Sequence, residues 1–155
     1  MYIVRAVETL PVVQCLEDQR LVIAGSGWAD EIPNDLDNVE APGYVPEDEL
    51  VDLYHRASVF YFPTLHEGFG LPVLEAMAVV TSDVYSVPEV TGDAALLFDP
   101  DDTAAHAEAI RDLLSDGERR HTLAERAVAR ADEFSWKQAA AETKAVYRTV
   151  TEDDH

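Results

Sequence analysis

Leu21-Val22-Ile23-Ala24-Gly25-Ser26-Gly27 is a continuous apolar run that ends in glycines. Apolar residues at consecutive positions predict a β-strand that is buried on both faces, as in a parallel sheet. A second run of this kind, Val59-Phe60-Tyr61-Phe62, stops at Pro63. The two runs therefore predict two strands of a largely parallel sheet, each followed by a loop.

Strands and helices alternate along the rest of the chain. Further strands are expected at 39–45, 79–82 and 95–98, and helices at 2–16, 47–57, from Pro72 through Met77, 103–114, 117–132 and 135–150. The first helix rests on the helical spacing of Ile3, Ala6, Val7, Leu10 and Val13. This alternation predicts an α/β, Rossmann-like layered fold with a mainly parallel sheet. One domain is expected over residues 1–150, followed by an acidic tail at 151–155.

The composition narrows the possible partners and surroundings. The chain has 155 residues, 31 of them Asp or Glu and 11 Lys or Arg, for a formal net charge of -20. Such a surface repels nucleic acids and anionic membranes. Dispersed acids with only two lysines, Lys137 and Lys144, are typical of a protein kept in solution by concentrated salt. We therefore expect a halophilic source, with an acidic mesophile protein as the alternative.

The single cysteine and the lengths of the apolar runs bear on the cell compartment. Cys15 is the only cysteine, which excludes an internal disulfide and argues against a cysteine-based metal site. No apolar run approaches the roughly 18 residues of a membrane span. We expect a cytoplasmic protein without stable membrane insertion.

Residues 63–78, PTLHEGFGLPVLEAMA, are the most informative for function. A strand end is followed by two glycines that let a ligand approach the backbone, and then by a helix start whose amides favour an anion such as a phosphate. Glu67 and Glu75 could accept hydrogen bonds from sugar or ribose hydroxyls. Each feature also has a plainer explanation: the glutamates are two of many acids, the glycines shape a turn, and His66 is an ordinary histidine.

As an ordered series, several segments resemble the donor-binding half of the retaining glycosyltransferases of family four, which have the two-domain GT-B fold. The block from Glu67 to Glu75 matches the family's E-x7-E motif, with Gly-Phe-Gly-Leu-Pro inside it and Glu-Ala-Met-Ala at its end. The other matching segments are 21–27, 43–46, 57–63, 87–90 and 134–136. The resemblance covers most of the chain, from about Leu21 to Val150.

The resemblance implies transfer of a sugar from a nucleotide-sugar, such as a UDP-, GDP- or ADP-sugar, to an acceptor hydroxyl with retained configuration. It implies no metal and no separate cofactor. Glu67, with His66 beside it, would form the catalytic group and contact the donor sugar, and Glu75 would bind the ribose. The remaining donor-binding residues would be Phe69, Gly70 and Leu71 around the sugar and diphosphate, and Gly25, Tyr44 and Val45 beside the nucleotide. For Tyr44, core packing is an equal alternative.

The chain also departs from the family pattern. We expect a domain truncated at its N-terminus, without the acceptor domain, the first strand and the basic Gly-Arg-x-x-x-x-Lys-Gly segment. The missing strand would leave a gap between the strands at 21–24 and 59–62, or force them to pair, and a naked edge could recruit a second copy. An acceptor-domain chain is the other expected partner. Since no turn residue follows Ala78, we expect a shortened helix, an irregular junction or a shifted strand there.

Two other functions stay open at this point. The chain could be a non-catalytic remnant or an interaction module derived from a glycosyltransferase. It could also belong to another GT-B enzyme, such as a nucleotide-sugar epimerase or a phosphorylase.

Overall fold

The computed structural model describes residues 2–4, 10–26, 32–33, 36–76 and 78–152. Strands and helices alternate along the described chain. In order, these elements are β1 (Tyr2–Val4), α1 (Leu10–Gln14), β2 (Leu21–Ala24), β3 (Val39–Gly43), α2 (Glu47–Arg56), β4 (Val59–Phe62), α3 (Leu71–Glu75), β5 (Val79–Ser82), α4 (Val87–Thr91), β6 (Ala95–Phe98), α5 (Thr103–Ser115), α6 (Gly117–Ala131) and α7 (Trp136–Glu152).

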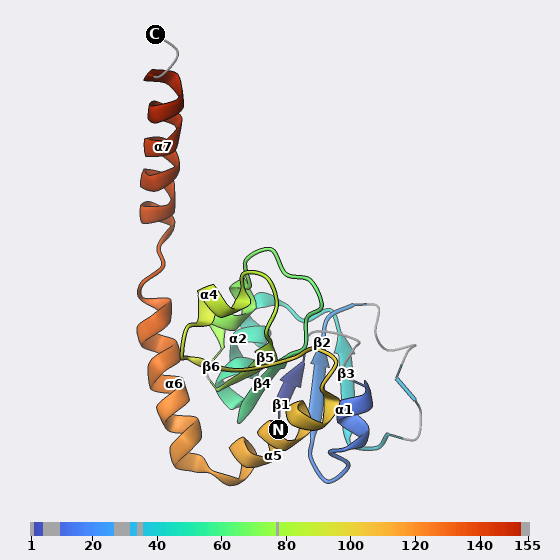
Figure 1. The fold of residues 1–155 in the computed structure, drawn as a ribbon. Helices are drawn as coiled ribbons and strands as arrows, with labels where there is room; N and C mark the ends of the chain where they lie inside the picture. The colour runs from blue at the N-terminus through green and yellow to red at the C-terminus, as the bar shows by residue number, and fades with distance from the viewer. Residues whose placement is uncertain (1, 5–9, 27–31, 34–35, 77, 153–155) are drawn as a thin grey trace.

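The six strands form one sheet in the order β3-β2-β1-β4-β5-β6. Every pair is parallel, and helices cover the sheet (Figure 1). This order is that of the doubly wound dinucleotide-binding fold. The expected α/β fold with a mainly parallel sheet is therefore confirmed.

The sequence interpretation of the N-terminal residues was wrong in part. A helix was expected over 2–16, but Tyr2–Val4 is strand β1, which lies between β2 and β4 and pairs with both. The helix α1 is confined to Leu10–Gln14, while residues 5–9 lie outside the described part. The expectation that the first strand is missing was therefore wrong, and β1 fills the expected gap between the strands at 21–24 and 59–62. A three-residue apolar segment fits strand and helix periodicity equally well. Pairing with a neighbouring strand on both sides favours the strand.

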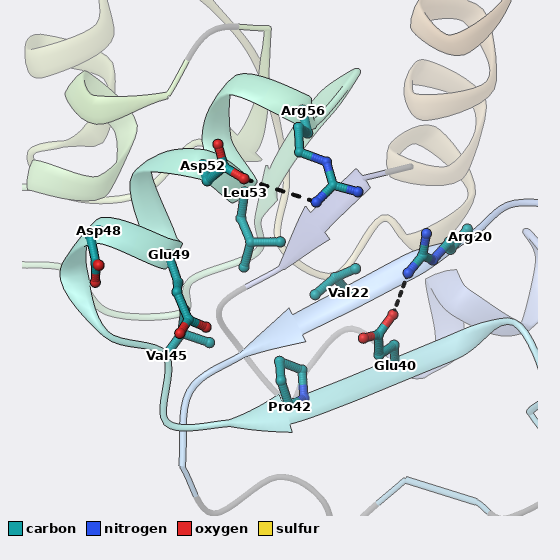
Figure 2. A pocket seen from close by; sticks show the side chains of 10 residues that line it. All are labelled: Arg20, Val22, Glu40, Pro42, Val45, Asp48, Glu49, Asp52, Leu53 and Arg56. Carbon is teal, nitrogen blue, oxygen red and sulfur yellow. Dashed lines mark hydrogen bonds and ion pairs between the residues drawn. The ribbon is translucent and has the colours of Figure 1, made fainter.

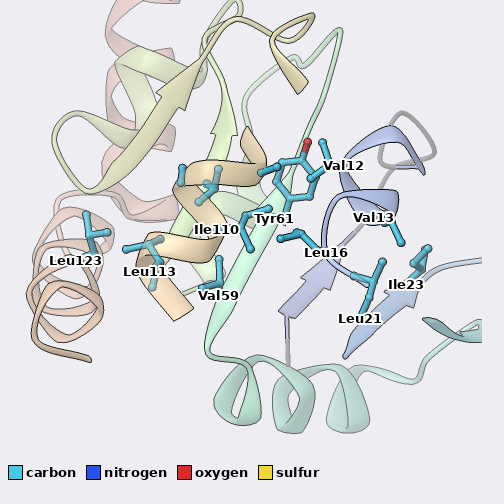
Figure 3. Packing of buried hydrophobic residues seen from close by; sticks show 14 residues of the cluster. Val12, Val13, Leu16, Leu21, Ile23, Val59, Tyr61, Ile110, Leu113 and Leu123 are labelled. Carbon is cyan, nitrogen blue, oxygen red and sulfur yellow. The ribbon is translucent and has the colours of Figure 1, made fainter. Parts of the chain in front are cut away.

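The core lies on both faces of the sheet because consecutive strand residues point to opposite sides. Leu21 and Ile23 belong to the cluster shared with α1 and α5, whereas Val22 and Ala24 belong to the cluster shared with α2 and α3. Ile110 of α5 is fully buried in the first cluster, which Figure 3 shows. This two-sided burial explains the continuous apolar runs of the sequence.

His106 of α5 is a buried polar group within this core. Its ring packs edge-on against Tyr61 and at a tilt against Phe98. Its Nε2–H donates to the carbonyl oxygen of Asp99 at 2.9 Å, and its Nδ1 has no hydrogen-bond partner among the described residues. Burial lowers the pKa of His106 below its ordinary value of 6.5, although the Asp99 carbonyl bond and the charges of Asp102 and Asp99 act in the opposite direction. His106 is thus held as a neutral imidazole.

Helix α3 is short, as the missing turn signal predicted. It ends at Glu75, and Ala76 is extended with φ -101° and ψ 164°. Met77, which was expected to continue the helix, lies outside the described residues. The short helix α4, whose second residue is Pro88, was not expected as a helix, because only five residues form it.

Helices α6 and α7 run along one side of the molecule, and α7 extends beyond the body (Figure 1). The side chains of residues 136–151 are all exposed. Ser135 Oγ accepts a hydrogen bond from the backbone N–H of Gln138 at 3.1 Å, which caps the start of this helix. Within the described residues, no helix is long and apolar enough to cross a membrane.

Candidate functional site

The carboxyl ends of the parallel strands meet at one edge of the sheet, where ligands bind in folds of this class. The loop after β4, residues 63–70, lies at this edge, as do the loops that follow β2, β3 and β5. Residues from the informative sequence block therefore share one end of the molecule with Gly25 and Tyr44.

A cavity of about 470 Å³ lies between this loop and α3. It is called the donor cavity below, after the ligand that the sequence resemblance implies. Five of the predicted site residues line it together with Phe62 and Pro72: Glu67, Phe69, Gly70, Leu71 and Glu75. The structure thus brings both glutamates of the E-x7-E motif onto one cavity, on either side of a stretch of backbone.

Glu67 organises the loop that carries it. Its Oε1 accepts hydrogen bonds from the backbone N–H groups of Gly68, at 3.0 Å, and Phe69, at 3.3 Å. Gly70 then takes a left-handed conformation, with φ 95°, as the residue before α3. A side chain there would be strained, since L residues rarely adopt this φ. The carboxylate and this turn together fix the backbone that faces the cavity.

The anion site expected at the start of α3 is weaker than the sequence suggested. The helix has only five residues, and Pro72 in its first turn has no N–H to donate. The Phe69 amide is already bonded to Glu67. A diphosphate would therefore need the amides of Gly70 and Leu71, or a rearrangement of Glu67.

Glu75 reaches the cavity from the other end of α3. It is exposed, and its Oε2 accepts a long hydrogen bond of 3.5 Å from the hydroxyl of Tyr54 on α2. Tyr54 is itself buried and packs edge-on against Phe60. A carboxylate that is open to solvent but steered by a fixed hydroxyl is suited to accept hydrogen bonds from a ligand diol.

His66, predicted beside Glu67, does not line the donor cavity. Its ring packs edge-on against Tyr85, with 4.4 Å between centroids. Tyr85 has φ 48°, although it is not a glycine, and its side chain is 69 % exposed. The loop after β5 is joined to the site a second time, because Ser86 Oγ donates to the carbonyl oxygen of Glu67 at 3.4 Å.

Sequence reasoning missed Tyr54 and Tyr85 as neighbours of the site. Tyr54 belongs to the apolar cluster on its face of the sheet, and its hydroxyl is the one signal in the sequence of a second role. Tyr85 sits in a loop with no motif of its own. Both approach the site from elements distant in sequence, so only the fold brings them there.

Gly25, Tyr44 and Val45 lie at the ends of β2 and β3 but do not line the donor cavity. The backbone N–H of Gly25 donates to the carbonyl of Gly43 at 2.9 Å, which holds the two loops together. Tyr44 is 78 % exposed, so core packing does not account for it. Val45 is half-buried and lines another cavity.

That other cavity, of about 410 Å³, lies between α2 and the strands β2 and β3 (Figure 2). Arg20 pairs with Glu40 at 2.5 Å and Arg56 with Asp52 at 4.0 Å. Asp48 and Glu49 add two more carboxylates to the lining, so acids outnumber the arginines. This charge balance disfavours a phosphate there.

A doubly wound parallel sheet with a cavity and two carboxylates at the carboxyl edge of its strands is typical of domains that bind nucleotides. The family described as glycosyl transferases group 1 matches residues 2–130. The chain belongs to this family.

Curated relatives agree with the assignment. The chain is 38 % identical over 142 residues to O-antigen chain mannosyltransferase B of Escherichia coli, a match that covers 84 % of this chain and 37 % of that protein. It is 36 % identical over 111 residues to D-inositol 3-phosphate glycosyltransferase of Corynebacterium urealyticum, covering 68 % of this chain and 26 % of that protein. The chain thus spans well under half the length of these relatives.

Solved structures share the fold. Sucrose-phosphate synthase from Thermosynechococcus elongatus superimposes with a TM-score of 0.82 at 24 % identity, covering 98 % of this chain and 46 % of that one. A glycosyltransferase from Rickettsia africae superimposes with a TM-score of 0.80 at 14 % identity, covering 97 % and 47 %.

Proposed function

We propose that this chain binds a nucleotide-sugar in the donor cavity and forms the donor half of a retaining glycosyltransferase of family four. The observation that carries the proposal is the placement of Glu67 and Glu75 on one cavity, on either side of the backbone at Phe69, Gly70 and Leu71. Family membership supports a sugar-transfer role for such a site.

In this proposal the two glutamates have different tasks. Glu67 accepts hydrogen bonds from the donor sugar, because it lies on the loop that enters the cavity. Glu75 accepts hydrogen bonds from the ribose hydroxyls, with Tyr54 steering its carboxylate. Gly25 and Tyr44 border the nucleotide from the neighbouring strand ends. His66 precedes Glu67 in the loop and packs against Tyr85 outside the cavity, so its part in this proposal is to hold the loop.

The proposed transfer step needs neither a metal nor a dedicated protein base. The acceptor hydroxyl oxygen bonds to the anomeric carbon while the bond from that carbon to the diphosphate oxygen breaks. The leaving diphosphate takes the hydroxyl proton. The task of the protein is to stabilise the negative charge that develops on the diphosphate. The backbone amides of Gly70 and Leu71, which line the cavity, are the donors that this proposal assigns to it.

We propose a hexosyl donor, with mannose first to be tested, because the relative from Escherichia coli is named as a mannosyltransferase. Turnover would also need an acceptor-binding half, since the named relatives are longer than this chain. Co-purification with a chain that carries an acceptor domain would support this arrangement.

The direct test is calorimetry of this chain with GDP-mannose, UDP-glucose and ADP-glucose in molar salt. We expect one of them to bind, and Glu75→Ala to weaken that binding by about tenfold or more, as expected for the loss of a charged hydrogen-bond acceptor. Glu89→Ala, an exposed glutamate outside the cavity, is the matched control. If a folded sample binds none of the three, the proposal fails; if Glu75→Ala binds as well as the unchanged chain, the ribose role fails.

A further inference from the structure

Phe69 carries the side chain that anchors the turn after Glu67. Gly68 and Gly70 stand on either side of it and have no side chains to pack, and the space beside Gly68 is open, with no atom within 4 Å of where a side chain would begin. The backbone N–H of Phe69 is bonded to Glu67 Oε1, and its ring is 44 % exposed. Whatever holds that ring therefore helps to set the direction of the next two backbone amides.

Phe134, in the segment between α6 and α7, holds the Phe69 ring. The two rings pack edge-on, at 89° to each other and with 5.8 Å between their centroids. An edge-to-face pair at this separation is a favourable arrangement of aromatic rings. Phe134 is half-buried and is not among the described residues that line the donor cavity. It therefore contacts the turn from outside the proposed ligand site.

Arg130 in turn holds Phe134. Its guanidinium lies over the Phe134 ring, 5.0 Å from the centroid. The guanidinium also donates to the carbonyl oxygens of Val90, at 2.9 Å, and Glu89, and pairs with the carboxylate of Glu133. Its edge is thus fixed by three oxygens while its face covers the ring, which a planar guanidinium can do and an ammonium cannot. Because all three of its nitrogens are engaged in these bonds, we assign Arg130 no contact with the diphosphate.

The same arginine is connected to the turn by a second route. The carbonyl oxygens that Arg130 binds belong to the end of α4, where a helix leaves its carbonyls without partners of its own. At the start of α4, Ser86 Oγ donates to the carbonyl oxygen of Glu67 at 3.4 Å. Helix α3 packs against both α4 and α6. Arg130 is therefore connected to Glu67 through α4, and its second connection, through Phe134, reaches Phe69.

We propose that Arg130 and Phe134 are positioning residues for donor binding. They hold the Phe69 ring from outside the cavity and so keep the backbone amides of Gly70 and Leu71 directed at the diphosphate. This inference rests on the proposed function, because the amides have this task only if a nucleotide-sugar binds. Loss of the Phe134 ring should weaken the hold on the diphosphate and leave binding of the nucleoside part unaffected.

The test compares a nucleotide-sugar with its nucleoside, on the whole chain in molar salt. Calorimetry measures the binding of GDP-mannose, UDP-glucose and ADP-glucose, and ligand-observed nuclear magnetic resonance measures that of guanosine, uridine and adenosine. We expect Phe134→Ala to weaken binding of the nucleotide-sugar about tenfold and to leave binding of the nucleoside unchanged. A merely structural role would lower both affinities alike. Phe134→Tyr, which keeps the ring, should restore most of the affinity.

Arg130→Lys tests the arginine, because it keeps the positive charge and loses the planar guanidinium. We expect weaker binding of the nucleotide-sugar, again with no effect on the nucleoside. Arg126→Lys is the matched control on the same helix. Arg126 pairs with the exposed Asp93, and of the described arginines only Arg130 lies over an aromatic ring. This control should bind like the unchanged chain.

Backbone amide spectra of the ligand-free variants give a second readout. The resonances of Gly70 and Leu71 should move in Phe134→Ala and stay in place in Arg126→Lys. Amides that do not move in Phe134→Ala would contradict the inference. The same spectra show whether each variant is folded, and Phe134→Leu, which keeps apolar bulk without a ring, replaces Phe134→Ala if that variant does not fold.

The inference and the proposed function fail in different ways. If the unchanged chain binds a nucleotide-sugar and the folded Phe134 variant binds it as tightly, the positioning role is wrong and donor binding stands. Equal losses for the nucleotide-sugar and the nucleoside also contradict the positioning role. If the unchanged chain binds no nucleotide-sugar, the proposed function fails, and the positioning role fails with it.

Discussion

Glu67 Oε1 lies 3.3 Å from the backbone nitrogen of Phe69, so the carboxylate proposed to contact the donor sugar also holds the loop on which it sits. Gly68 makes a second bond of the same kind. One side chain therefore has two roles: it is proposed to bind the donor sugar, and it holds the loop. An informative substitution must change the first role and keep the second.

Glu67→Gln makes this separation, because its amide oxygen still accepts from the two backbone N–H groups while the negative charge is lost. We expect the affinity for the nucleotide-sugar to fall by about tenfold. The affinity for the free nucleoside diphosphate, which lacks the sugar, should stay unchanged. Calorimetry with both ligands measures the difference, and Glu89→Gln is the control. Equal losses for both ligands would contradict contact with the sugar.

His106 makes stability depend on pH in a predictable direction. Because burial lowers its pKa below 6.5 in the folded chain, the unfolded chain binds the proton first as pH falls. The free energy of unfolding should therefore decrease below about pH 6.5, by at most about 1.4 kcal/mol per pH unit, and stop decreasing below the folded pKa. Urea unfolding between pH 5 and 8 measures this slope.

His106→Phe keeps a ring between Tyr61 and Phe98 but removes the titrating group. It should abolish the contribution of His106 to the slope, while the lost bond to Asp99 lowers stability at every pH. His121→Phe, on the exposed side of α6, should keep the slope. A slope that survives His106→Phe would assign the pH dependence to other groups.

Salt should stabilise the fold, because a net charge of -20 makes the compact chain repel itself. Raising potassium chloride from about 0.1 M to about 1 M shortens the screening length from about 10 Å to about 3 Å. We expect the melting temperature to rise across this range in calorimetric scans. Betaine at matched osmolality, which does not screen charge, should raise it less. Equal effects of the two solutes would argue against charge repulsion.

Strand β1 makes the most direct prediction about the fold. Tyr2–Val4 should give Cα and Cβ chemical shifts of extended backbone, and Leu10–Gln14 those of a helix. Ile3→Pro should strongly destabilise the chain, because it removes a backbone N–H from a strand that has neighbours on both sides. Helical chemical shifts at Tyr2–Val4 would contradict strand β1 and would support the helix that the spacing of apolar residues indicated.

Most of the sheet could be predicted from sequence because two-sided burial leaves continuous apolar runs, as at 21–24 and 59–62. Strand β1 could not, since three residues are too few to show a period. The donor cavity was predictable to the extent that its residues are close in sequence: Glu67 and Glu75 flank a single loop and a short helix. The positions of Tyr54 and Tyr85 beside this site could not be predicted from sequence. They result from the packing of α2 and of the loop after β5 near α3 and the loop after β4.

Strand β3 forms one edge of the sheet and carries Glu40 and Pro42. Proline offers no N–H to a further strand, and the exposed carboxylate disfavours a close neighbour of the same charge. Another copy of this highly acidic chain is therefore a poor partner for this edge. We therefore expect the sheet to stop growing at β3, which protects this edge from strand-to-strand aggregation.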